Sequence, residues 1–188
     1  EFLFNEVSDK ELKQISNLST PNQVFLVVEK PTALFQKAKM AKNFALYLDN
    51  IQDPGNLGTI WRIADWFGLP YVFCSKGCVD WSNSKVIQAS MGAFLRVQVL
   101  QKFFFELREE LPDVPTYAAV LGGDNIFKTD FAKHGIIVIG NESKGISEEI
   151  QQAATFKIAI PKGQNGGAES LNAAVATGII CGQLAVNI

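Results

Sequence analysis

The chain of 188 residues is 47 % hydrophobic and 19 % charged, which gives it enough length and apolar content for one main domain with a sizeable core. Its formal net charge of -2 excludes a general electrostatic attraction to nucleic acid, so any RNA-binding surface has to be local. No apolar run is long enough for a membrane span and no secretory signal pattern opens the chain, so we expect a cytoplasmic protein.

The cysteines and the single histidine predict neither a disulfide framework nor a metal site. Three cysteines lie in or beside apolar runs: Cys74, Cys78 and Cys181. An odd number so placed favours reduced, half-buried thiols, and the first two lack the further Cys or His ligands that zinc or an iron–sulfur cluster needs. His134 precedes a predicted strand at a surface turn, and no Ser-His-Asp set can be built around it.

A small leading segment comes first, with loosely helical apolar spacing over 6–18 and a short β-branched run over 24–30. Strand and helix signals then alternate: strand 44–48, helix 57–67, strand 71–74, helix 83–94, helix 101–110, strand 116–121, strand 135–139, helix 147–154, strand 156–160 and helix 170–186. This alternation predicts an α/β fold whose mainly parallel sheet has helices on both faces. The three tryptophans, Trp61, Trp66 and Trp81, are interpreted as core anchors.

Three glycine-bearing loops follow strands 44–48, 135–139 and 156–160, and each opens a helix. They read "DNIQDPGNLGTIWR", "GNESKGIS" and "IPKGQNGGAESLNAAVATGII". Ligands of a doubly wound sheet bind at the carboxyl ends of the strands, so the predicted site lies where these loops gather. The G-x-G-x-x-G fingerprint is absent from the first loop, which disfavours a nucleotide-dependent oxidoreductase.

Polar residues in the first two loops allow both a structural and a chemical interpretation. Asn56 is the predicted N-cap of its helix, and Arg62 either is a surface residue or contacts phosphate and stabilises a developing alkoxide. In the second loop Ser147 is placed to cap the next helix. Glu142 is not explained by that cap, and is either a solvated turn residue or a carboxylate that holds an arginine or accepts a hydroxyl proton.

In the third loop Ser170 is the predicted N-cap, while Asn172 is placed inside the helix and projects toward the same edge of the sheet. The rest of this helix, 171–186, is almost wholly apolar. It is predicted to be a buried helix, and so apolar a helix also suits packing across a dimer axis.

Taken together, "NLGTIWRIADWFG", "VIGNESKGIS" and "IPKGQNGGAESLNAAVATGI" resemble the three motifs of the SpoU (TrmH) branch of the SPOUT RNA methyltransferases, in the same order and spacing. "SKVIQASMGAFLRV" resembles the segment that connects the first two motifs. The resemblance covers residues 20–188 and implies a C-terminal deep trefoil knot, S-adenosylmethionine bound in that knot and a homodimer. It also implies methyl transfer to a ribose 2′-hydroxyl of RNA, with ribosomal RNA favoured over transfer RNA.

Position by position, the resemblance assigns catalysis to five polar residues: Asn56, Arg62, Glu142, Ser170 and Asn172. It assigns cofactor contacts to four others: Gly140, Asn141, Ile160 and Leu171. Lys162 departs from the Met of the family, and segment 162–169 is longer by roughly two residues, which supports the alternative of a catalytically silent RNA- or ribosome-binding member.

Domain organisation also follows from the resemblance. Residues 1–40 are similar to the end of the family's N-terminal RNA-binding domain with its linker, and residues 41–188 to its catalytic domain. Because the chain opens at Glu1 without Met, we expect the intact protein to carry a further, more basic domain of about 70 to 100 residues.

Overall fold

The computed structural model describes residues 4–16, 18–32 and 34–187, and the chain divides into two compact units, residues 1–32 and 33–188. The first unit holds helix α1 (Asp9–Ile15), which opens with a capping box because the side chains of Ser8 and Glu11 each accept from the other's backbone N–H. Residues 24–32 follow in an irregular conformation. The β-branched run predicted there therefore pairs with no strand in the described part of the chain.

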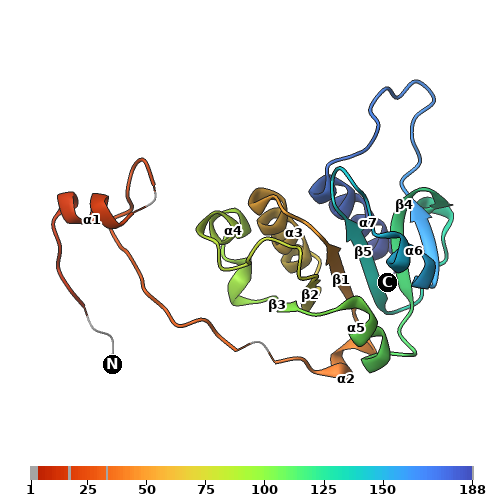
Figure 1. Cartoon of the computed structure of the whole chain (residues 1–188), viewed down its shortest axis with the longest axis horizontal. Helices are drawn as coiled ribbons and strands as arrows, with labels where there is room; N and C mark the ends of the chain where they lie inside the picture. Colours follow the sequence, from red (N-terminus) through yellow and green to blue (C-terminus); the bar gives the residue numbers. More distant parts are fainter. Residues whose placement is uncertain (1–3, 17, 33, 188) are drawn as a thin grey trace. The chain divides into compact units, whose positions relative to one another are not determined.

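The second unit is built on a parallel sheet (Figure 1). Its strands are β1 (Phe44–Asp49), β2 (Tyr71–Cys74), β3 (Gln98–Gln101), β4 (Thr116–Asn125), β5 (Gly135–Gly140) and β6 (Phe156–Ala159). They are ordered β3-β2-β1-β5-β4-β6, and neighbouring strands pair in parallel throughout. The predicted α/β class and parallel sheet are confirmed.

Helices cover both faces of this sheet, as predicted. On one face lie α3 (Pro54–Trp66), α4 (Ser84–Ser90), the short helix η1 (Ala93–Leu95) and α7 (Ala173–Asn187). The other face carries α2 (Lys37–Met40), α5 (Phe104–Glu110) and α6 (Glu148–Ala153). A second short helix, η2 (Ile126–Lys128), follows β4. Each face has its own cluster of buried side chains, and β1 contributes alternate residues to both.

Two predicted helices have different bounds in the structure. The helix predicted over 83–94 ends at Ser90, because Met91 and Gly92 take left-handed φ values of 50° and 87°. The helix predicted over 101–110 is confirmed as α5, which begins three residues later, at Phe104. The sequence did not predict strand β3, whose residues 98–101 pair with β2 along their whole length and include Gln101 of the predicted helix.

The prediction of three core tryptophans is confirmed for two of them. Trp61 is buried, and its indole Nε1 donates to the carbonyl of Val97 at 2.9 Å. Trp81 packs edge-on against it, with ring centroids 6.1 Å apart. Trp66 is 83 % exposed, so its prediction is wrong: the buried stripe of α3 ends at Ala64 and Trp66 points away from it. No helix in the described ranges is long and apolar enough to cross a membrane.

Candidate active site

The three predicted loops meet at the carboxyl edge of the sheet. Strands β1 and β5 are neighbours in register, with Asp49 beside Gly140, so the loops that leave them start side by side. The Asn172 side chain donates from Nδ2 to Oδ1 of Asn56 at 2.9 Å, and Asn56 donates from its own Nδ2 to Oε1 of Glu142 at 2.5 Å. A chain of side-chain hydrogen bonds thus joins the starts of α3 and α7 to the loop after β5.

Asn56 is available for this chain because it does not cap α3. The N-cap is Asp53, whose carboxylate accepts from the backbone N–H of Asn56 at 2.7 Å, and Pro54 occupies the first helical position. The prediction of Asn56 as the cap is therefore wrong by one turn, because proline fixes the first turn at residue 54. This cap leaves the Asn56 amide free to bond on both sides.

The cap of α7 also differs from the prediction. The helix begins at Ala173, and Oδ1 of Asn172 accepts from the backbone N–H groups of Ala174 and Val175 at 2.9 and 3.2 Å. Asn172 is thus the capping residue rather than an interior one, and Ser170 lies before the helix in an exposed loop. With its oxygen held by the helix, the Asn172 amide is oriented to present its N–H group to Asn56.

Two of the five residues that the resemblance marks as catalytic lie outside this hydrogen-bonded chain. Arg62 is exposed on α3, and within the described ranges it makes none of the bonds that connect Asn56, Glu142 and Asn172. Ser170 is exposed as well. Both are therefore accessible to a large substrate rather than locked into the protein.

The loop after β5 is a tight turn that comes within contact distance of its own strand. Asn141 and Gly145 exchange two backbone hydrogen bonds of 3.0 and 2.9 Å, and Gly145 has a left-handed φ of 69°. A β-carbon on Gly140 would lie 2.3 Å from the carbonyl carbon of Gly145, closer than real contacts allow. Only glycine fits at 140, because the backbone of Gly145 and Ile146 occupies the space that a side chain would need.

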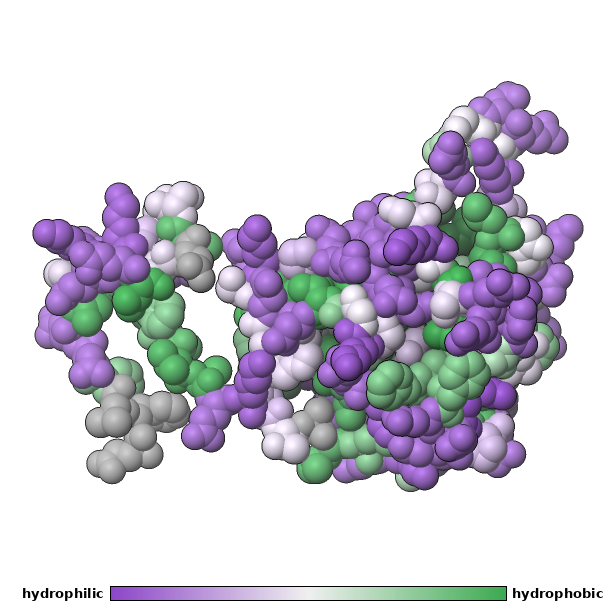
Figure 2. Space-filling view, viewed as in Figure 1, coloured by the Kyte–Doolittle hydropathy of each residue, from purple (hydrophilic) through white to green (hydrophobic). Residues whose placement is uncertain are grey.

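The loop between β6 and α7 projects from the rest of the unit (Figure 1), and residues 161–172 are all exposed. Its surface is mostly hydrophilic in Figure 2. At its base, Ile160 packs partly buried against the core, whereas Leu171 is 46 % exposed just before the Asn172 cap. These two apolar side chains are available for a flat aromatic ligand such as adenine.

Sequence reasoning missed two residues of this edge. Asp49, at the end of β1, is 2 % exposed and accepts from the backbone N–H of Ser147 at 2.8 Å. Ser147 is the N-cap of α6 by position, but its side chain makes no capping bond. Asn50 has a left-handed φ of 58°. The available signal was a carboxylate at the end of an apolar strand, followed by a residue type that tolerates this conformation.

The three cysteines are free, and two of them, Cys74 and Cys78, lie next to this edge. Cys78 donates from Sγ to the carbonyl of Leu48 at 3.2 Å. Interaction with the thiol of Cys74 lowers the pKa of Cys78 to about 7, against a smaller opposing effect of burial. The same interaction together with burial raises the pKa of Cys74, and burial raises that of Cys181 to about 12. Across the described residues, no group of three or more His, Cys, Asp or Glu side chains is placed to hold a metal.

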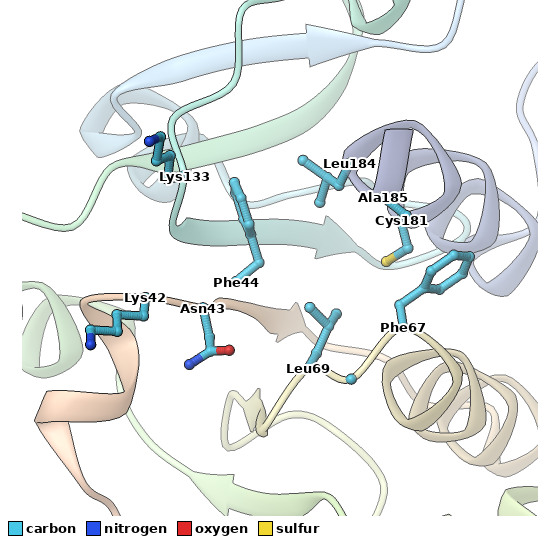
Figure 3. Close-up of a pocket in the computed structure, with 10 residues that line it drawn as sticks. Lys42, Asn43, Phe44, Phe67, Leu69, Lys133, Cys181, Leu184 and Ala185 are labelled. Carbon is cyan, nitrogen blue, oxygen red and sulfur yellow. The ribbon is translucent and has the colours of Figure 1, made fainter. Parts of the chain in front are cut away.

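A separate cavity of about 130 Å³ lies at the opposite edge of the sheet (Figure 3). Apolar side chains from the end of α3, the end of α7 and the start of β1 converge on it, among them Phe67, Leu184 and Phe44. His134 precedes β5 at this same amino end, away from the polar chain. Neither the cavity nor the histidine belongs to the candidate active site.

Comparison with known proteins agrees with this architecture. The model of the SpoU rRNA Methylase family matches residues 43–182, and the chain belongs to this family. An uncharacterized tRNA/rRNA methyltransferase of Synechocystis sp. is 32 % identical over 144 residues, which cover 72 % of this chain and 50 % of that protein. The 23S rRNA (guanosine(2553)-2′-O)-methyltransferase RlmP of Bacillus subtilis is 28 % identical over 179 residues, which cover 93 % of this chain and 69 % of that protein.

Among solved structures, the AdoMet-bound rRNA methyltransferase of Sinorhizobium meliloti superposes with a TM-score of 0.70 at 29 % identity, covering 76 % of this chain and 55 % of that chain. The chain thus spans about half the length of the first of the two curated relatives described above and about two thirds of the second.

Proposed function

We propose that this chain transfers the methyl group of S-adenosylmethionine to a ribose 2′-hydroxyl of RNA, with ribosomal RNA favoured over transfer RNA. The observation that carries the proposal is the hydrogen-bonded chain Asn172–Asn56–Glu142, which joins all three loops at one edge of the sheet. Family membership and the 2′-O activity named for the Bacillus relative support the same chemistry. Three neutral or acidic groups alone would not specify an RNA substrate, so the substrate class rests on the relatives.

The residues at this edge fit the proposed cofactor. Gly140 and Asn141 are assigned to the cofactor because they lie where β5 ends at this edge, in the turn that Asn141 and Gly145 close. Ile160 and Leu171 offer apolar surface to its adenine. The bound cofactor would supply an electrophilic methyl group. Among the described residues, no group of three or more His, Cys, Asp or Glu side chains is placed to hold a metal ion.

Activation of the ribose hydroxyl falls to the side chains. A hydroxyl is barely acidic, so the site has to align it and stabilise its oxygen as the proton leaves. A guanidinium group is a poor base, so we assign Arg62 to orient the ribose and stabilise negative charge on that oxygen. Asn56 holds Oε1 of Glu142, and the second carboxylate oxygen is assigned to take the proton, directly or through water or a phosphate.

Methyl transfer with a matched variant tests this function. The protein is incubated with tritiated S-adenosylmethionine and either ribosomal or transfer RNA, and the RNA is digested to nucleosides to identify 2′-O-methylated products. Glu142→Gln preserves the size of the side chain and its bond to Asn56 but removes the proton acceptor. We expect it to bind the cofactor as the wild type does and to lose transfer. No 2′-O-methyl product from either RNA would contradict the proposal.

A catalytically silent RNA-binding member of the family is the second candidate. Its support is the loop over 161–172, which is exposed along its length and carries Lys162 in place of the methionine of the family. Calorimetry separates the candidates, because a silent member would show no heat with S-adenosylmethionine at millimolar concentration while still binding RNA.

We further propose that the chain acts as a homodimer through the outer side of α3 and α7. These helices pack on each other, with Ile63 in contact range of Gly178. Trp66 and Val175 project from the pair and are 83 % and 52 % exposed. Large apolar side chains at such exposure favour an interface. Light scattering at micromolar concentration should give a dimer, and Trp66→Lys should give a monomer.

We propose that residues 1–40 belong to an RNA-binding part of the intact protein. Within this range, residues 1–3, 17 and 33 lie outside the described structure. The apolar run at 24–28 supports this, since its valines and leucine are 67 % to 88 % exposed and require a partner to be buried. Filter binding and methyl transfer by this chain and by a longer form, at equal salt, test the idea. Equal activity of the two would contradict it.

The chain's three free cysteines suit the reducing cytoplasm, where we place the protein.

A further inference from the structure

Asp49 and Asn50 form a junction between three segments of the sheet edge. The carboxylate of Asp49 is buried and accepts two hydrogen bonds, one from the backbone N–H of Ser147 at 2.8 Å and one from Nδ2 of Asn50 at 2.7 Å. Charged acceptors make the stronger hydrogen bonds, and a buried carboxylate is retained only where such bonds satisfy it. Asp49 therefore ties the end of β1 to the end of the loop after β5.

The backbone of Asn50 ties the start of the same loop. Its N–H donates to Oγ of Ser75 at 2.9 Å, and its carbonyl accepts from Nδ2 of Asn141 at 2.8 Å. The left-handed φ of 58° sets the direction of these backbone groups, and asparagine and glycine adopt this conformation at the lowest cost. The oxygen of the Asn141 amide accepts from the N–H groups of Ser143 and Lys144, so this one side chain also organises the turn that follows.

We propose that Asp49 and Asn50 are positioning residues that hold the loop over 141–147 at both of its ends and thereby set the position of Glu142. The inference rests on the proposed methyltransferase function for its consequence, whereas the clamp itself is a property of the protein without ligand. Glu142 lies between the two anchor points, Asn141 and Ser147, and reaches Asn56 at 2.5 Å. A loop released at either end would present neither this carboxylate nor the backbone of 140–142 in one place.

Two substitutions of the same residue separate the backbone from the side chain. Asn50→Gly keeps the left-handed conformation, and with it both backbone hydrogen bonds, although it removes the bond to Asp49. Asn50→Val places a β-branched residue in a conformation it strongly disfavours, so the carbonyl turns away from Asn141. We expect Asn50→Gly to retain cofactor affinity and kcat within threefold. Asn50→Val should lose about tenfold in each, with cofactor affinity measured by calorimetry.

Hydrogen exchange of the ligand-free protein tests the clamp apart from activity. Amides in 141–147 should exchange at least tenfold faster in Asp49→Ala and in Asn50→Val than in the wild type, and as in the wild type in Asn50→Gly. In the double variant Asn50→Val/Asn141→Ala, amides in 141–147 should exchange no faster than in Asn141→Ala alone. The reason is that the carbonyl of residue 50 acts on the loop through the side chain of Asn141.

Any of three results would overturn the inference. The first is unchanged hydrogen exchange of the loop in Asn50→Val, and the second is an equal loss of cofactor affinity and kcat in Asn50→Gly and Asn50→Val. The third is an additive increase of the exchange rate in the double variant. A wild-type protein that transfers no methyl group would instead contradict the proposed function, and the exchange experiment would still decide on the clamp.

Discussion

Gly140→Ala is the most direct perturbation of the proposed cofactor loop. The added β-carbon would lie 2.3 Å from both the carbonyl carbon of Gly145 and the nitrogen of Ile146, and an ordinary contact requires at least 3.4 Å. The neighbouring atoms are backbone, so the loop has to move by about 1 Å, a shift that also displaces Glu142 from Asn56. Overpacking of this kind costs about 1 to 3 kcal/mol.

Because the loop gives way more easily than the strand, we expect most of this cost to appear as lost cofactor affinity. The range corresponds to about a 5- to 150-fold rise in the Kd for S-adenosylmethionine, measured by calorimetry. Gly182→Ala in α7 is the matched control. Its β-carbon meets only Phe67, at 4.0 Å, so cofactor affinity should not change and the free energy of unfolding should stay the same or rise. A Gly140→Ala protein that binds the cofactor like the wild type would refute the role of this loop.

Three further predictions concern the surroundings of the site. Arg62→Ala should abolish methyl transfer and leave cofactor affinity within a few-fold, and equal losses in calorimetry and transfer would show that the arginine is misassigned. Alkylation of Cys78 by iodoacetamide should rise with pH to a midpoint of about 7 instead of the ordinary 9.0, because the interaction with Cys74 favours the thiolate; mass spectrometry of the modified peptide reports it. Gly58→Ala should lower the urea midpoint of unfolding although alanine favours helix, because its β-carbon would lie 2.5 Å from that of Ala89. A higher midpoint would mean that α4 moves aside to accommodate the added carbon.

The sequence predicts the sheet and the edge at which the loops gather because both depend on local patterns. Apolar runs mark β1 and β5, and the polar residues after them have to lie at the carboxyl edge once the strands are parallel. Strand β3 was missed because its four residues at the end of the sheet become a strand only by pairing with β2. Pairing of this kind is a tertiary effect that local spacing does not encode.

The site itself shows a finer limit of prediction. Asn56, Glu142 and Asn172 were all predicted, yet both asparagines were given the wrong helical position. Asparagine, aspartate and serine are nearly equivalent as N-caps, so composition alone could not choose between Asp53 and Asn56, or between Ser170 and Asn172. The choice matters for the hydrogen-bonded chain, because Oδ1 of a capping Asn56 would point to the N–H groups of its own helix instead of to Asn172. The trefoil knot implied by the resemblance stays a prediction.

The charges around the site separate the requirements of the cofactor from those of RNA. The hydrogen-bonded chain contains two neutral amides and one carboxylate, and the proposed cofactor contacts are backbone groups and apolar side chains, so none of them attracts phosphate. The cations at this edge are few: Lys144 and Lys162 on the loops and Arg62 on α3, and all three are exposed. Binding to RNA grows with the number of phosphates that are neutralised, and three cations at this edge neutralise few of them. Under the proposed function, this edge holds the cofactor and aligns one ribose, and most of the affinity for RNA has to come from residues outside this edge.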